Sequence, residues 1–276
     1  SALDSAGNES NYSNEVNATP YYPGPIWHVA TTGSDSTGDG SDGSPFATIQ
    51  KGIDESSNGD TVLVQPGTYV ENIIWPATNG IKLIGSGEDD CFIDGNQQSV
   101  VIRFDQDLGG IIDTTTVIKS FTIKNGLGVS GGGIHCYLSS PSLVNLTITN
   151  NSAGDGGGIY CSNNCIPSLV NVSLTNNSAS SDGGGIFSSN SSPSLENVTI
   201  IGNTANSSGG GILFTSNSSS ILKNVTISGN SASSDGGGIY CVNSSPSLEN
   251  VTISGNSALY YGGGLYLQQS NTIMDN

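Results

Sequence analysis

The sequence predicts an all-β solenoid in which short parallel strands stack turn upon turn. Two signals recur about every 26 residues along its second half, and a fixed period of this size is typical of stacked repeats. The first signal is three glycines followed by an aliphatic residue, at 131–134, 156–159, 183–186, 209–212, 236–239 and 262–265. The second begins with asparagine and alternates apolar and hydroxyl residues, at 145–148, 171–174, 197–200, 224–227 and 250–253.

Each repeat is predicted to hold two or three short strands joined by turns. In the repeat at 193–212, Val198 and Ile200 are apolar and Thr199 between them is polar, which is the period of a strand. The runs of glycine, asparagine and serine favour turns and disfavour a helix. One unit cannot bury its apolar side alone, but stacked units pair each strand with its equivalent about 4.8 Å away.

Stacking is expected to place like residues in columns along the solenoid. Three columns point inward: Leu146, Val172, Val198, Val225 and Val251; Ile148, Leu174, Ile200, Ile227 and Ile253; and Ile134, Ile159, Ile186, Ile212, Ile239 and Leu265. A column of asparagines lies at a bend, where the side-chain amides bond to one another and to backbone groups left unpaired by the turn. Its members are Asn151, Asn177, Asn203, Asn230 and Asn256.

The repeats carry two family resemblances. Residues 226–232, Thr-Ile-Ser-Gly-Asn-Ser-Ala, and the Gly-Gly-Gly-Ile-Tyr run at 236–240 resemble turns of the pectate-lyase-like superfold. They also resemble the Gly-Gly-x-Ile and Phe-x-x-Asn repeats of chlamydial polymorphic outer-membrane proteins, although Ile or Leu stands here in place of Phe. The likeness covers residues 117–276 and implies a right-handed parallel β-helix. It implies no single activity, because one superfold hosts many functions.

The chain is expected to divide into five segments: a remnant of an upstream domain (1–20), a linker (21–25), an opening strand with an acidic loop and a short capping helix (26–60), irregular β-helix turns (61–130) and regular repeats (131–276). The remnant, through residues 4–10, resembles the last hairpin of a fibronectin type III domain, which implies an extracellular parent. The capping helix is expected to begin at Pro45 with Ser44 as its N-cap. Three apolar residues at helical spacing would plug the open end of the solenoid: Phe46, Ile49 and Ile53.

The two ends of the solenoid are expected to differ from its middle. The irregular turns hold an opening strand at 26–29 and then strands at 61–64, 70–75, 81–84, 91–94, 100–104 and 117–123. The last repeat is expected to be shortened, because eight positions separate Gly264 from Thr272 and fourteen separate Gly238 from Thr252. No capping sequence follows, so we expect either that the protein continues past Asn276 or that this end self-associates.

Composition excludes some partners. The chain of 276 residues holds 6 Lys+Arg against 23 Asp+Glu, a formal net charge of -17. Nucleic acid is not expected as a partner, because phosphate binding needs a basic surface. A polyanionic glycan would be repelled unless bound cations bridge it. No apolar run is long enough to span a membrane.

The cysteines leave three interpretations open. Cys136 and Cys161 occupy the same position in neighbouring repeats, so stacking brings their Cα atoms within disulfide range. Cys161 can instead close a small loop to Cys165. The third interpretation is that these three, together with Cys91 and Cys241, remain buried thiols that behave as small apolar residues.

Two groups of aspartates are candidate Ca²⁺ ligands, because Ca²⁺ binds several carboxylate and carbonyl oxygens. The acidic loop contributes Asp35, Asp39 and Asp42, whose spacing does not match an EF-hand. Asp155 and Asp182 precede glycine runs on adjacent turns. In both groups the alternative is an ordinary turn-forming role, which we favour.

A mostly aromatic column is expected to point outward, one residue after the inward aliphatic residue of each glycine run. Its members are His135, Tyr160, Phe187, Leu213, Tyr240 and Tyr266, with Arg103 one turn earlier. Exposed aromatic rings can stack on sugars or on a protein partner, so Tyr160, Phe187, Tyr240 and Tyr266 are the candidate binding face. The alternatives are that a loop or a neighbouring domain covers these rings, or that they only stabilise the sheet.

Two functions fit these observations. The uninterrupted repeats and the scarcity of basic residues favour a non-catalytic module, and the resemblance of the N-terminal remnant to a fibronectin type III domain implies an extracellular one at the cell surface. Its role would be adhesion, carbohydrate binding or surface and filament architecture, with a glycan or surface protein as partner. The alternative, implied by the resemblance, is a Ca²⁺-dependent polysaccharide lyase acting on an acidic glycan. Such a lyase needs a base and a cation, and its candidate catalytic residues are Arg103, Lys124 and His135.

Overall fold

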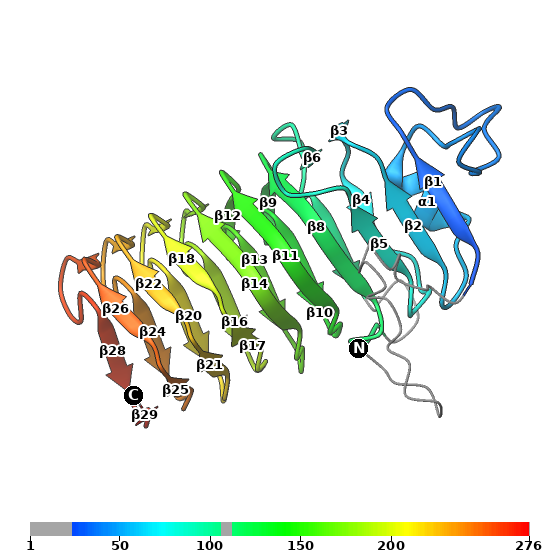
Figure 1. The fold of residues 1–276 in the computed structure, drawn as a ribbon. Coiled ribbons are helices and arrows are strands. Elements are labelled where there is room, and N and C mark those ends of the chain that lie inside the picture. The colour runs from blue at the N-terminus through cyan, green and yellow to red at the C-terminus, as the bar shows by residue number, and fades with distance from the viewer. Residues whose placement is uncertain (1–23, 106–111, 276) are drawn as a thin grey trace, which may run out of the picture.

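The computed structural model describes residues 24–105 and 112–275, which wind into the predicted right-handed parallel β-helix (Figure 1). The fibronectin-like remnant at 1–20 and the first residues of the linker lie outside the described residues. Successive turns stack along one axis, and their strands form three sheets that run along it. The described chain contains one short helix and no helix that is long and apolar enough to cross a membrane.

The largest sheet has 15 strands. Its main path is β1 (Ile26–Val29), β2 (Thr61–Val64), β5 (Lys82–Gly85), β8 (Val117–Lys124), β11 (Ser142–Thr149), β14 (Ser168–Thr175), β17 (Ser194–Glu196), β21 (Ile221–Lys223), β25 (Ser247–Glu249) and β29 (Ile273–Asp275). Beside this path lie β3 (Gly67–Val70), β6 (Cys91–Asp94), β18 (Thr199–Ile201), β22 (Thr226–Ser228) and β26 (Thr252–Ser254).

Two smaller sheets complete the turns. The eight-stranded sheet contains β4 (Ile73–Ile74), β7 (Ile102–Asp105), β10 (Ile134–Tyr137), β13 (Ile159–Ser162), β16 (Ile186–Ser189), β20 (Ile212–Thr215), β24 (Ile239–Val242) and β28 (Leu265–Gln268). The six-stranded sheet contains β9 (Leu127–Ser130), β12 (Ser152–Asp155), β15 (Ser178–Ala179), β19 (Thr204–Ala205), β23 (Ser231–Ala232) and β27 (Ser257–Ala258). The six-stranded sheet therefore begins later along the axis than the eight-stranded sheet.

The core consists of the predicted inward columns. Leu146 pairs with Val172 and Ile148 with Leu174 across β11 and β14, and Ile134 pairs with Ile159 across β10 and β13. These columns are buried along the regular turns, except for their last members at the C-terminal end, which are partly buried. A further inward column completes the core: Leu143, Leu169, Leu195, Leu222 and Leu248.

The predicted asparagine column is present, and all of its members except the last, Asn256, are buried. The side-chain oxygen of Asn177 accepts both the backbone and the side-chain N–H of Asn151, at 3.1 and 3.0 Å. The same pattern continues at each following turn. A second ladder was not predicted: the first asparagines of the repeated motif bond amide to amide on the surface, in a left-handed conformation. These residues are Asn145, Asn171, Asn197, Asn224 and Asn250.

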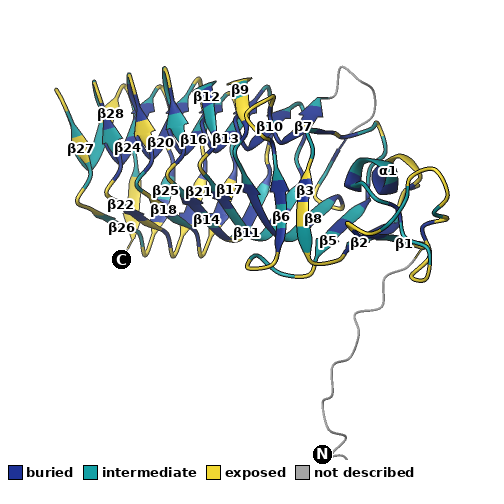
Figure 2. Cartoon of the chain, turned by 90° about the horizontal axis from the view of Figure 1, so that it is seen from above, coloured by how far each residue is buried: buried dark blue, intermediate teal, exposed yellow. Residues whose placement is uncertain are grey.

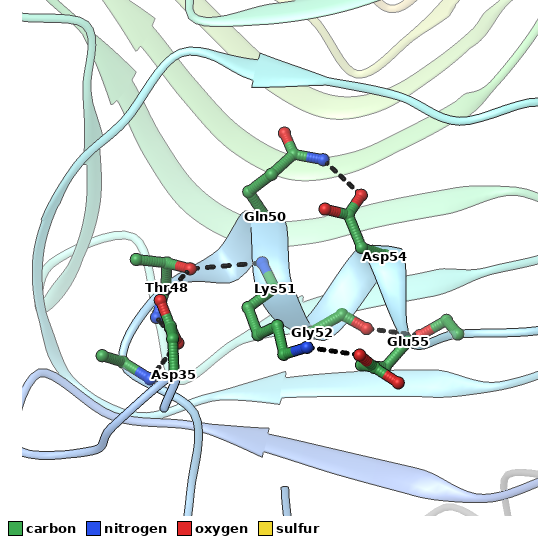
Figure 3. A network of polar contacts seen from close by, with 9 residues as sticks. Asp35, Thr48, Gln50, Lys51, Gly52, Asp54 and Glu55 are labelled. Atoms are coloured by element: carbon green, nitrogen blue, oxygen red, sulfur yellow. Dashed lines mark hydrogen bonds and ion pairs between the residues drawn. The ribbon is translucent and has the colours of Figure 1, made fainter. Parts of the chain in front are cut away.

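The predicted start of the capping helix is wrong. Helix α1 spans Ile49–Asp54, and its N-cap is Thr48, whose hydroxyl accepts the Lys51 N–H (Figure 3). The preceding segment stays extended because Phe46 forms a parallel bridge with Val29 of β1. The plug itself is confirmed, since Phe46, Ile49 and Ile53 are all buried.

Two further expectations, about the irregular turns and about the last repeat, are corrected. The strand expected at 70–75 is two strands in different sheets, β3 and β4, because the chain turns a corner between them. The last repeat is not shortened: Ile273 of β29 lies opposite Ser247, so the spacing of 26 residues continues. Thr272 directly precedes β29, which pairs with β25, so it is not the equivalent of Thr252 on β26.

The five cysteines are buried free thiols, as the third interpretation expected. Cys136 and Cys161 are directly paired residues of β10 and β13. Cys165 lies in a column otherwise made of serine, where its sulfur accepts the Ser139 N–H at 3.2 Å and its own N–H donates to the Ser191 hydroxyl at 3.1 Å.

Candidate functional site

The predicted aromatic column lies on the outer face of the eight-stranded sheet. Parallel pairing puts His135, Tyr160 and Phe187 side by side on β10, β13 and β16. The rings of His135 and Tyr160 lie 5.2 Å apart with 14° between their planes, and those of Tyr160 and Phe187 lie 5.1 Å apart with 6°. The sequence had predicted the column but not this close stacking.

Leu213 divides the column into two stacks. Its side chain is only 4% exposed, and it separates Phe187 from Tyr240. In the second stack Tyr240 and Tyr266 lie 5.4 Å apart, and Tyr261 stacks on Tyr266 at 5.5 Å. Because these rings stack on their neighbours, ring faces inside each stack are occupied and ring edges meet solvent. Open faces are therefore found at the ends of the stacks.

A cleft of about 400 Å³ lies at the N-terminal end of the first stack. It is bounded by residues 98–100, by strand β9 and by two side chains of the eight-stranded sheet, Arg103 and His135. These two side chains are paired residues of β7 and β10. The cleft exists because β9 is the first strand of its sheet, so within the described chain no strand of that sheet lies beside the β7 turn.

His135 is held as a neutral imidazole in a defined tautomer. Its Nδ1 lies 2.9 Å from the carbonyl oxygen of Ser130, which can only accept, so Nδ1 carries the proton. Burial lowers the pKa of His135 below its usual value, and the hydrogen bond to Ser130 offsets this only in part. Nε2 is therefore left with a lone pair that can accept a hydrogen bond.

The structure brings two of the three candidate catalytic residues together and separates the third. Arg103 lines the cleft and forms an ion pair with Asp105, two residues along β7. Lys124 lies on β8 of the fifteen-stranded sheet, where its ammonium is 3.8 Å from Asp94 and 4.5 Å from the Phe92 ring centroid. Lys124 is therefore engaged on a different face of the solenoid from Arg103 and His135.

The aspartates that precede the glycine runs hold the backbone of the following turn. Asp155 Oδ1 accepts the Asp182 N–H at 3.2 Å, and Asp182 Oδ1 accepts the Ser208 N–H at 2.8 Å. Asp235 repeats this contact with Tyr261 at 3.1 Å. Each carboxylate thus satisfies a donor that the turn would otherwise leave unpaired.

The acidic loop is likewise held by its own carboxylates. Asp35 accepts three hydrogen bonds, from the N–H groups of Ala47 and Thr48 and from the Thr48 hydroxyl (Figure 3). Burial raises the pKa of Asp35, but these bonds outweigh it and the net pKa is lowered. Asp39 accepts the Ser41 N–H, and Asp42 lies 3.5 Å from His28. In residues 24–105 and 112–275, no three His, Cys, Asp or Glu side chains are grouped so as to hold a metal ion.

Comparison with known proteins agrees with this architecture. A family model described as the right handed beta helix region matches residues 132–276. The chain belongs to this family. No curated protein sequence matches this β-helix.

Solved structures show the same fold at low sequence identity. A pectin methylesterase from carrot superposes on 92% of this chain and 84% of its own, with 13% identity and a TM-score of 0.53. The pectate lyase Pel9A superposes on 89% of this chain and 78% of its own, with 15% identity and a TM-score of 0.52. At such identities the likeness shows the fold alone.

The cleft is the feature that sequence reasoning missed. Leu127 and Val129 of β9 were not predicted as site residues, yet they are 47% and 90% exposed. One signal was available: the run at 127–130 stands where later repeats hold small polar residues and alanine, so its apolar side chains break the pattern. Figure 2 shows β9 as the exposed yellow strand beside the better buried β12.

Proposed function

We propose that this chain is an extracellular, non-catalytic β-helix module that binds a glycan at the cell surface through the outer face of the eight-stranded sheet. The observation that supports it is the stacked aromatic column, which ends in an open cleft with hydrogen-bonding groups. Aromatic rings bury large areas at little entropic cost and stack on sugars. Two other partners remain open to experiment: a surface protein bound in adhesion, and a second copy of this chain bound at the C-terminal end.

A binding assay tests the proposal. The whole chain is titrated against a panel of neutral and acidic polysaccharides, with Tyr160→Ala as the variant. Tyr160 stacks on His135 and Phe187, so its removal leaves the His135 ring at the cleft without support; it should weaken glycan binding and cost about 1–3 kcal/mol of stability. If no polysaccharide binds, the glycan proposal is wrong. If Tyr160→Ala lowers stability but leaves the affinity unchanged, the column is structural.

A second candidate function is supported by the pairing of Arg103 with His135 in one cleft. A neutral imidazole beside a guanidinium can act as a base in a Ca²⁺-dependent polysaccharide lyase. Incubation with acidic polysaccharides and Ca²⁺, following unsaturated product by ultraviolet absorbance, tests this candidate. Activity that disappears in His135→Phe would replace the non-catalytic proposal with the lyase.

A further inference from the structure

We infer that the cleft between β9 and the Arg103–His135 pair is a subsite for one neutral sugar unit of a glycan chain. This inference rests on the proposed glycan binding and adds the site and the chemistry of the ligand. The cleft volume, about 400 Å³, lies at the small end of the range of ligand pockets, about 300–1,000 Å³. The site is thus sized for a short piece of ligand, not for a long buried chain.

The walls of the cleft are held in place by backbone contacts. The Leu127 N–H donates to the Ser99 carbonyl at 2.9 Å, which ties β9 to the segment before β7. The Asn72 amide donates to the Ser99 and Val100 carbonyls, each at 3.1 Å. A preformed site of this kind spends little binding free energy on ordering itself.

The cleft offers the two kinds of contact that a sugar ring needs. Leu127 and Val129 provide apolar surface for the C–H face of a ring, and at 90% exposure Val129 has no other packing role. His135 Nε2 accepts a hydrogen bond from a hydroxyl, and the Arg103 N–H groups not bound to Asp105 donate to one. Gln98 also lines the cleft, and its side-chain amide donates to the Asn96 carbonyl at 3.3 Å.

The charges around the cleft favour a neutral sugar over a uronate. Arg103 is the only arginine of the chain, and Asp105 compensates its charge. Burial keeps His135 uncharged at neutral pH, since it lowers the pKa of this imidazole. The formal net charge of -17 adds long-range repulsion of polyanions. The structure therefore assigns to this cleft a ligand different from the acidic polymer expected of a lyase.

Isothermal titration calorimetry on the full chain tests the subsite by measuring the affinity for short oligosaccharides. The probes are neutral gluco-, manno- and xylo-oligosaccharides and, for contrast, oligogalacturonate. His135→Phe keeps a ring to stack on Tyr160 but removes the acceptor, so it should weaken neutral binding at least about tenfold, as should Arg103→Gln. The matched controls are His28→Phe and Ile221→Ala; Ile221 is 55% exposed on β21 of another sheet, and both should bind like the wild type. Val129→Ala should weaken binding about threefold through lost apolar contact.

Each outcome decides between the inference and the broader proposal. The subsite is supported if the affinity for neutral oligosaccharides falls in His135→Phe and Arg103→Gln but not in the controls. If neutral oligosaccharides bind both cleft variants as tightly as the wild type, the subsite is wrong and the glycan binds elsewhere on the sheet. Tighter binding of oligogalacturonate than of every neutral probe also overturns it. If no probe binds, both the subsite and the proposed function are wrong.

Discussion

Asn177 donates its side-chain amide to Asn203 Oδ1 on the next turn at 3.0 Å, and the same oxygen accepts the Asn177 backbone N–H at 2.9 Å. The amide also donates to the Ile148 carbonyl at 2.9 Å. Each buried asparagine thus links three turns and satisfies backbone groups at a bend. The buried ladder is therefore a structural element that joins successive turns of the solenoid.

Replacing Asn177 by alanine should lower the free energy of unfolding by about 3–5 kcal/mol, because several buried donors and acceptors lose their partners. The matched control is Asn197→Gly in the exposed ladder, where Gly tolerates the φ of 54° and water replaces the lost bonds. The control should cost less than about 1 kcal/mol. Urea denaturation measures both, and equal losses would show that burial of the ladder does not matter.

Stability should fall as the pH is lowered below about 6.5 because of His135. Burial lowers its pKa in the folded state, so the unfolded state takes up the proton first and gains stability relative to the fold as pH falls. His135→Phe removes this contribution. Between pH 7.5 and pH 5.5 the unfolding free energy of the wild type should therefore fall more than that of His135→Phe. A difference that is constant with pH would contradict a half-buried imidazole with a lowered pKa.

Asp182 should act as a hydrogen-bond acceptor for the next turn. Asp182→Asn keeps an oxygen for the Ser208 N–H and removes one negative charge, so its melting temperature should equal or exceed that of the wild type. Asp182→Ala loses the acceptor and should cost about 0.5–1.5 kcal/mol. Thermal melts measure both variants. If Asp182 instead binds Ca²⁺, CaCl₂ should raise the melting temperature of the wild type but not that of Asp182→Asn.

The repeating part of the fold could be predicted because stacking forces equivalent residues into register. The inward column at Ile134 and the buried column at Asn151 follow directly from a period of about 26 residues. Where the period is absent, tertiary contacts decided the structure. Because Phe46 forms a bridge with Val29, the helix begins only at Ile49. Helix propensity alone does not indicate this start.

The candidate site was predictable only in part for a similar reason. Periodicity placed His135 and Tyr160 on one outward face, and the structure confirms that position. It could not show that the rings occupy each other's faces, because that depends on side-chain rotamers. Nor could it show the cleft, which arises where the six-stranded sheet begins at β9, one irregular turn after β7.

The thiols of the folded protein should be unreactive toward an aromatic disulfide reagent at pH 8. Burial raises the pKa of Cys91 to about 11 and those of Cys165 and Cys241 to about 12, so very little thiolate is present. Denaturant should release 5 reactive thiols, as counted by absorbance and by the mass of the alkylated chain. An inter-turn disulfide between Cys136 and Cys161, or a loop closed by Cys161 and Cys165, would leave two thiols fewer.

Replacing Cys165 by serine tests whether its sulfur has a role beyond packing. Because Cys165→Ser continues the serine column, it should change the unfolding free energy by less than about 1 kcal/mol. A larger loss would mean that the sulfur at this position has a role that a hydroxyl cannot replace.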